Sequence, residues 1–219
     1  MSNRSAVSPP RSRGRRATRP SGDERESAIL TTLERMLEGR PFAEISVDDL
    51  AKGAGLSRPT FYFYFASKEA VLVRLFARMI ADIDPARHEG AGTTLAEDPE
   101  AVWREGIFAF FDALRPHRAV ALAGLAAMAN NEELRHLWSA FMTAWVDYTA
   151  ELITAERARG AAPDTIPAHD LATALNLMNE RVVFASQDTQ NPTLPEDAAL
   201  EALAHVWVAS IYGPSAPRT

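Results

Sequence analysis

Apolar residues recur at helical spacing along most of the chain, and the alternation typical of β-strands is not found in the sequence. In one stretch, for example, Ile29, Leu33, Met36 and Leu37 fall on one face of a helix that Gly39 ends. The same pattern predicts helices near residues 23–38, 46–54, 57–65, 67–84, 100–115, 117–129, 131–158, 168–187 and 195–212. The fold class that follows is all-α, with about nine helices.

The aromatic run from Phe61 to Phe65 has two competing interpretations. Five consecutive aromatic residues favour a strand by propensity. Ser57, however, is a good helix cap ahead of Pro59, and a single strand would lack a partner in an otherwise helical chain. We therefore predict a helix here.

Residues 46–65 have the layout of a helix-turn-helix, in which a tight turn containing glycine joins two short helices. Ser46 and Asp49 match a capping box that opens the first helix. Ala51 is small enough for the second helix to approach closely, and Gly55 permits a backbone conformation that other residues resist. The alternative is a helical hairpin whose aromatic residues only fill a core.

The second helix of such a motif enters the major groove of DNA, with its N-terminal residues at the base edges. We therefore expect Arg58, Pro59 and Thr60 to face the bases, with Arg58 able to bind guanine through two hydrogen bonds. Tyrosine hydroxyls suit phosphate, and a lysine at a helix start adds to a position that attracts anions. The candidate DNA-binding residues are Ser46, Arg58, Pro59, Thr60, Tyr62, Tyr64 and Lys68.

Charge is distributed unevenly along the chain, whose formal net charge is −6. The first 84 residues contain 14 Lys and Arg against 11 Asp and Glu, whereas the remainder contains 9 against 18. Residues 1–22 are rich in Ser, Pro, Arg and Gly and are predicted to form a disordered basic arm. This polarity indicates a basic head that can meet phosphate and an acidic body that phosphate repels.

The composition excludes several classes of protein. The chain has no cysteine, so a disulfide framework, thiolate metal sites and a cysteine nucleophile are ruled out. No apolar run is long enough to span a membrane, and no signal-peptide core follows the basic start. We expect a cytoplasmic, nucleoid-associated protein that does not bind a membrane.

Sequence signatures of enzymes are scarce. Glu133 and His136 have the Glu-x-x-His spacing of di-iron bundles, but a second copy is missing, so a solvated helix face is the simpler interpretation. The sequence has no nucleophile elbow, phosphate loop or dinucleotide fingerprint. We expect no catalysis, no cofactor and no metal.

The segment from Ser46 to Leu72 resembles the DNA-binding signature of the TetR family of one-component repressors. It contains Ala-Gly-Leu-Ser, then the run Tyr62 to Phe65, which fits a Tyr-x-(His/Tyr)-Phe ending, and then Ser-Lys-Glu. The resemblance implies an N-terminal three-helix domain that binds operator DNA, a helical ligand-binding domain, and a two-fold dimer.

Aromatic residues form stripes in the second part of the chain. The two stripes are Trp103, Ile107, Phe110 and Leu114 on one helix, and Trp138, Met142, Trp145 and Thr149 on another. Such stripes usually pack a core, but a buried amide at Asn176 or Asn179 could bind a ligand carbonyl; solvent exposure of both amides is the alternative. The candidate ligand-binding residues are Trp103, Gly106, Ile107, Phe110, Leu114, Trp138, Met142, Trp145, Tyr148, Thr149, Asn176, Asn179, Val183, Phe184 and Trp207.

Three regions are predicted. They are the basic arm (1–22), a helix-turn-helix domain (23–66), and a ligand-binding and dimerisation domain (67–219) that opens with a connecting helix at 67–84.

Two helices, 168–187 and 195–212, are the candidates for the dimer interface. An apolar stripe on the first of them lies apart from the side that carries the two asparagines, so it could serve a partner subunit. The candidate interface residues are Leu171, Leu175, Met178, Val182, Leu200 and Leu203.

Further segments, among them 168–184 and 210–213, resemble one subgroup of the TetR family. This resemblance implies a long, apolar, aromatic-lined channel and release from DNA by a small hydrophobic amide, ester or ketone. It also implies control of a neighbouring gene for a flavin-dependent Baeyer–Villiger monooxygenase. The alternatives are a DNA-binding protein without ligand response and an all-helical enzyme.

Overall fold

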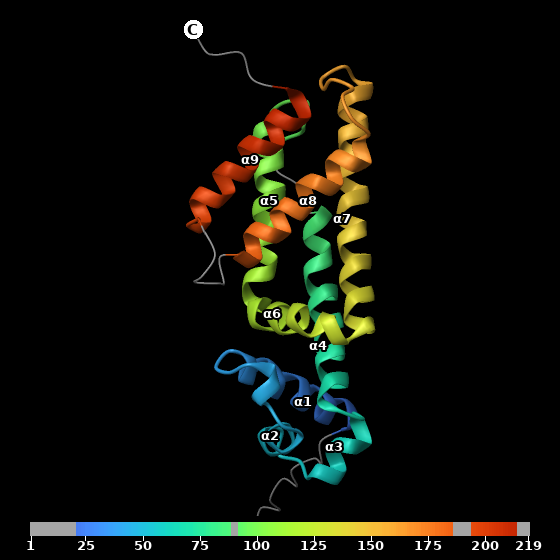
Figure 1. Ribbon diagram of the computed structural model, residues 1–219, viewed down its shortest axis with the longest axis vertical. Helices are drawn as coiled ribbons and strands as arrows, with labels where there is room; N and C mark the ends of the chain where they lie inside the picture. Colours follow the sequence, from blue (N-terminus) through green and yellow to red (C-terminus); the bar gives the residue numbers. More distant parts are fainter. Residues whose placement is uncertain (1–20, 89–91, 186–193, 214–219) are drawn as a thin grey trace, which may run out of the picture.

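The computed structural model describes residues 21–88, 92–185 and 194–213, which contain nine α-helices and no strand (Figure 1). The helices are α1 (Gly22–Leu37), α2 (Val47–Gly53), α3 (Arg58–Tyr64), α4 (Lys68–Ile83), α5 (Pro99–Leu114), α6 (Arg118–Ala127), α7 (Glu132–Ala158), α8 (Ala168–Ala185) and α9 (Glu196–Tyr212). Short 3-10 helices lie at Phe42–Glu44, Asp84–His88, Arg115–His117 and Met128–Asn130. The predicted all-α fold is confirmed, including the helix over the aromatic run.

Polar residues begin most of these helices, as the sequence predicts for Ser46 and Ser57. In each case a side-chain oxygen accepts a hydrogen bond from a free backbone N–H of the first turn. The caps are Ser21 for α1, Ser46 for α2, Ser57 for α3, Ser67 for α4, Asp98 for α5 and Asn131 for α7. One boundary was wrong: Ser21 and Gly22, assigned to the basic arm, start α1 because Ser21 and Glu24 form a capping box. The rest of that arm lies outside the described residues.

The helices fall into two groups along the long axis of the molecule (Figure 1). Helices α1, α2 and α3 gather at one end of α4, and α4 runs from them into the larger group. There α5 and α7 are roughly parallel to the long axis, α6 crosses near the junction, and α8 and α9 run obliquely to that axis. Any shift of α4 therefore moves the first three helices.

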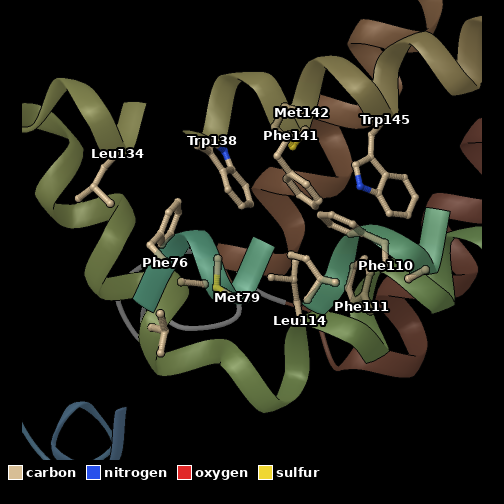
Figure 2. Packing of buried hydrophobic residues seen from close by; sticks show 14 of the residues in the cluster. Phe76, Met79, Phe110, Phe111, Leu114, Leu134, Trp138, Phe141, Met142 and Trp145 are labelled. Atoms are coloured by element: carbon tan, nitrogen blue, oxygen red, sulfur yellow. The ribbon is translucent and has the colours of Figure 1, made fainter. Parts of the chain in front are cut away.

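A single hydrophobic cluster joins the two groups of helices. Ile29, Leu50 and Phe61 are fully buried among the first three helices. Farther along α4, Phe76 and Met79 meet the aromatic side chains of α5 and α7 (Figure 2). Burial of this apolar surface is the main stabilising contribution to the fold.

Gly124 fixes a close crossing between α4 and α6. A Cβ atom at this position would overlap the ring of Phe76. The same ring contacts Trp138 of α7, with ring centroids 6.0 Å apart. Interiors this tightly packed transmit displacement, so α6, α7 and α4 are mechanically connected at Phe76.

The α8 stripe predicted to face a partner subunit is covered within the chain itself. Leu171 and Leu175 are 6% and 3% exposed, and Met178 packs against the same core. The large apolar side chain of α8 that is exposed among the described residues is that of Leu177, at 52%. The prediction was wrong for Leu171 and Leu175, which are buried because α7 packs against α8.

Candidate DNA-binding face and ligand chamber

The turn between α2 and α3 has the geometry that the sequence predicts for a helix-turn-helix. Gly55 has φ +68°, in the left-handed region that favours glycine. The N–H of Leu56 donates to the carbonyl of Ala51 at 2.8 Å and that of Gly55 to the carbonyl of Lys52 at 3.0 Å, which together form a Schellman motif. Ala51 is 2% exposed, so its small side chain is what α3 meets at the crossing.

The aromatic run of α3 divides between two faces of the helix. Phe61 is buried and Phe65 is nearly so, which anchors α3 to α1 and α2. Tyr62 and Phe63 point outward, and Phe63 is 83% exposed. An exposed phenylalanine beside the predicted base-reading residues belongs to the candidate DNA-binding face, although the sequence interpretation did not include it; its position two residues after Phe61 was the available signal.

Arg58 lies on the exposed face at the start of α3. Its Nη1 is 3.4 Å from Oδ1 of Asp48, and its Nη2 donates to the Tyr62 hydroxyl at 3.3 Å. The hydrogen bond with Tyr62 and the negative charge of Asp48 raise the pKa of the Arg58 guanidinium. The side chain is thus a cation held on the surface by Asp48 and Tyr62.

Four of the seven predicted DNA-binding residues line one shallow groove, namely Ser46, Arg58, Tyr62 and Lys68. Of the others, Pro59 and Thr60 occupy the first turn of α3, where Thr60 bonds to Ser57 at 2.8 Å. Tyr64 is half-buried against the core. The Ser46 hydroxyl is already hydrogen-bonded to Asp49. Hydrogen bonds from the backbone N–H and the hydroxyl of Ser46 lower the pKa of Asp49.

The ammonium of Lys68 is bound by groups of the protein itself and is not left open for a phosphate. Its ammonium donates to the carbonyls of Phe42, Ala43 and Ile45 at 3.1, 3.1 and 2.8 Å, and it lies 4.7 Å from the Phe42 ring centroid. These bonds use all three ammonium hydrogens. We therefore interpret Lys68 mainly as a positioning residue, which ties the turn before α2 to the start of α4.

Replacing Lys68 by alanine is expected to lower the free energy of unfolding by roughly 1.5–3 kcal/mol, because three charge-assisted hydrogen bonds are lost. Urea unfolding followed by circular dichroism measures this change. The matched control is Lys52→Ala, since Lys52 is the other lysine of the chain and is exposed. Equal stability of the two variants would contradict the positioning role.

Nine of the fifteen predicted ligand-binding residues surround one cavity, called here the chamber. They are Trp103, Gly106, Ile107, Trp145, Tyr148, Thr149, Asn176, Asn179 and Trp207. Ala86, Arg87, Val102 and Leu152 complete the wall and were missed. Ala86, Val102 and Leu152 are small or aliphatic and give no distinct signal, and Arg87 lies in the 3-10 helix after α4, away from the aromatic stripes. The free volume is about 70 Å³, below the roughly 300–1,000 Å³ of ligand pockets, so a ligand has to displace side chains.

A second cavity of about 250 Å³ lies beside α8. It is lined by three more of the predicted residues, Leu114, Val183 and Phe184. The remaining three belong to the aromatic cluster of Figure 2. Phe110 contacts Trp145 with ring centroids 5.1 Å apart, and Trp138 contacts Phe184 at 5.8 Å. Met142 lies in the same cluster and is 8% exposed.

Both asparagines of α8 are buried, each 5% exposed, so the solvent-exposed alternative is wrong. Nδ2 of Asn176 donates to the Thr149 hydroxyl at 3.1 Å and to the Ala172 carbonyl at 2.9 Å. Oδ1 of Asn179 accepts from Nε1 of Trp207 at 3.1 Å. The amides therefore connect α7, α8 and α9 around the chamber.

A chain of polar groups starts at Trp103 in the chamber wall. Nε1 of Trp103 donates to the Tyr212 hydroxyl at 3.0 Å, which in turn donates to Glu156 at 2.7 Å. Burial raises the pKa of Glu156, but the hydrogen bonds from Arg159 and Tyr212 outweigh it and leave that pKa below its usual value; burial also raises the pKa of Tyr212. The sequence interpretation missed Glu156, although an acid in register with Thr149 and Ile153 on one helix face was visible.

Two expected absences concern metals and membranes. Glu133 and His136 are exposed on α7, and no group of metal-ligating side chains is found in residues 21–88, 92–185 and 194–213. Within the same ranges, every helix is too short or too polar to cross a bilayer.

An exposed recognition helix after a glycine turn, joined through one long helix to an all-α body with internal cavities, defines the class of helix-turn-helix transcriptional regulators. Residues 29–75 match the family of bacterial regulatory proteins named after TetR, and residues 103–213 match the C-terminal domain of the transcriptional regulator EthR. The chain belongs to the TetR family, with the C-terminal domain of the EthR regulators.

Similar proteins agree with this assignment. The chain is 58% identical to the HTH-type transcriptional regulator EthR of Mycobacterium tuberculosis over 201 residues, which are 92% of this chain and 93% of that one. The EthR of Mycolicibacterium smegmatis is 53% identical over 92% of both chains. Among solved structures, a TetR-family regulator from Streptomyces coelicolor has a TM-score of 0.69 at 18% identity, covering 87% of this chain and 81% of that one. The flavonoid-responsive regulator FrrA has a TM-score of 0.59 at 20% identity, covering 91% and 100%. The chain is a transcriptional regulator of the EthR and TetR type and not an enzyme.

Proposed function

We propose that this regulator is a repressor that binds operator DNA as a homodimer and leaves it when a small hydrophobic ligand occupies the chamber. The observation that carries the proposal is the pairing of an exposed recognition helix with a buried, aromatic-walled cavity in one chain. DNA is bound by the groove that Ser46, Arg58, Tyr62 and Lys68 line, with Arg58, Pro59 and Thr60 at the bases. The regions at 23–66 and 67–219 act as the DNA-binding domain and the ligand-binding and dimerisation domain.

Dimerisation is proposed through α8 and α9. Helix-turn-helix regulators read two half-sites about 34 Å or a multiple apart, which requires two recognition helices in a two-fold arrangement. Exposed apolar side chains on the two helices support this choice, with Leu177 of α8 52% exposed and Val206 of α9 39% exposed. These residues replace the buried stripe as candidates for contact with the partner.

The ligand signal is proposed to reach DNA through α4. Ala86 and Arg87 line the chamber and belong to the 3-10 helix Asp84–His88, which directly follows α4. A ligand that displaces this 3-10 helix therefore shifts the helix that carries α1, α2 and α3. The ligand binds the conformation that releases DNA more tightly than the conformation that binds DNA. The ratio of these two ligand affinities sets how far the affinity for DNA falls.

A hydrophobic amide, ester or ketone is the proposed ligand class, and a neighbouring Baeyer–Villiger monooxygenase gene is the proposed target. Both come from the similarity to EthR, and the name of FrrA supports response to small aromatic molecules in this fold. A constitutive DNA-binding protein is the second candidate. Adding a hydrophobic ketone or amide to the operator complex separates the two, since only the first candidate releases DNA.

Arg58→Ala is expected to weaken discrimination at one base pair of each half-site by about 1–3 kcal/mol, because the guanidinium supplies the bidentate contact to guanine. Selection of binding sites from a random duplex library, before and after the change, measures it. Arg74→Ala is the control, because it removes the same charge from α4, where Arg74 pairs with Glu26 of α1. Unchanged selected sequences with Arg58→Ala would refute the placement of the recognition helix.

A further inference from the structure

The indole N–H groups of the four tryptophans have unequal partners. Trp103 donates to the Tyr212 hydroxyl at 3.0 Å, Trp138 to Glu180 at 2.6 Å and Trp207 to Asn179 at 3.1 Å. Trp145 is also buried, at 7% exposure, yet its Nε1 has no hydrogen-bond partner among the described residues. A buried donor without an acceptor is rare in folded proteins because it destabilises them.

The surroundings of Trp145 show where an acceptor would lie. Trp145 belongs to the wall of the chamber, beside Gly106 and Asn176. In Figure 2 the ring nitrogen is on the side that faces Phe110, and the two rings meet edge to face at 73° with centroids 5.1 Å apart. The face of a phenyl ring accepts a hydrogen bond only weakly, so an oxygen atom at this point would be a better partner.

Several polar groups of the chamber have partners within the protein. Oδ1 of Asn179 accepts from Trp207, and Nδ2 of Asn176 donates to two oxygens. Arg87, the charged side chain that lines the chamber in the described part of the chain, pairs with Asp84 at 2.7 Å. A ligand oxygen therefore gains a bond at Trp145 without breaking one, and no unpaired cation favours an anionic ligand.

We propose that the chamber selects a neutral, mainly apolar molecule through one oxygen acceptor, a carbonyl or ether, which receives the N–H of Trp145. The oxygen lies between the indole and Phe110, whose ring moves aside, and the apolar remainder lies along Trp103 and Ile107. This inference rests on the proposed ligand response. It adds Trp145 as a polar anchor beside Asn179, which the sequence suggested.

Two matched probes test the assignment on the full-length protein. Cyclohexyl phenyl ketone carries the acceptor, and cyclohexylphenylmethane replaces its C=O by CH2. Trp145→Phe is expected to weaken binding of the ketone about threefold to tenfold and to leave binding of the hydrocarbon within twofold, as measured by calorimetry. Trp207→Phe is the matched control, because it removes an N–H that Asn179 already holds, and it is expected to affect both probes alike.

Nitrogen-15 NMR of the unaltered protein gives a second readout that does not depend on a variant folding. The ketone is expected to move the Trp145 indole proton downfield, and the hydrocarbon is not. The acceptor assignment is overturned if Trp145→Phe weakens the binding of both probes equally. It is also overturned if the indole signal responds equally to both probes. In either case the ligand response stands. If neither probe binds the unaltered protein, the chamber is not a site for this ligand class, and both the inference and the proposed ligand class fail.

Discussion

Operator affinity is expected to fall about a thousandfold when the salt concentration rises from 50 to 200 mM. A dimer that neutralises roughly 6–10 phosphates releases the counterions condensed on them, and salt opposes that release. The effect is expected although the chain has a net charge of −6, because the positive charge is concentrated before residue 84. Fluorescence anisotropy of a labelled operator over a salt series measures the slope.

Deletion of residues 1–20, which contain six arginines, tests the source of that slope. The truncated protein is expected to have a flatter salt dependence and an unchanged preference among sequences, since arm arginines contact phosphates and α3 contacts bases. Replacing the six arginines by glutamine separates charge from chain length. An affinity that does not change with salt would exclude the proposed mode of DNA binding.

The Gly106→Trp variant is expected to lose operator affinity by about 5-fold to 150-fold while it remains folded and dimeric. A Cβ atom at Gly106 meets no other atom within 4 Å, so a side chain can enter the chamber there. An indole is much larger than the free volume of about 70 Å³, so it displaces the chamber walls as a ligand would. The size of the effect is that of a typical coupling free energy between two sites.

Two controls separate filling of the chamber from general damage. Gly106→Ala is expected to bind DNA normally and to gain roughly 0.5–1 kcal/mol of stability, because alanine is the better helix former. Glu105→Trp adds the same indole to the exposed side of α5. Operator binding by electrophoretic mobility shift and dimerisation by analytical ultracentrifugation are the measurements. Normal DNA binding by folded Gly106→Trp would argue against the chamber as the site of the signal.

The helix boundaries, the turn and the buried helix faces could be predicted from the sequence, because the residues that determine each of them lie within a few positions of one another. Ser46 caps α2 through Asp49, three positions away, and Gly55 ends that helix through a turn that closes on Ala51. Helical spacing placed Trp103 and Ile107 on one buried face of α5 in the same way. Helix-turn-helix, all-α fold and aromatic stripes follow from such short-range rules.

What each polar side chain does was decided only by the tertiary structure. Lys68 looks like a free cation in the sequence, yet its ammonium meets carbonyls 23 to 26 residues away. Asn179 looks like an open amide, yet it holds Trp207, 28 residues later. The unpartnered N–H is at Trp145, which no sequence pattern distinguishes from Trp103. Helical periodicity predicts which face of a helix is buried. The hydrogen-bond partner of a buried group, however, depends on the packing of helices that are distant in the sequence, and that packing exists only in the folded chain.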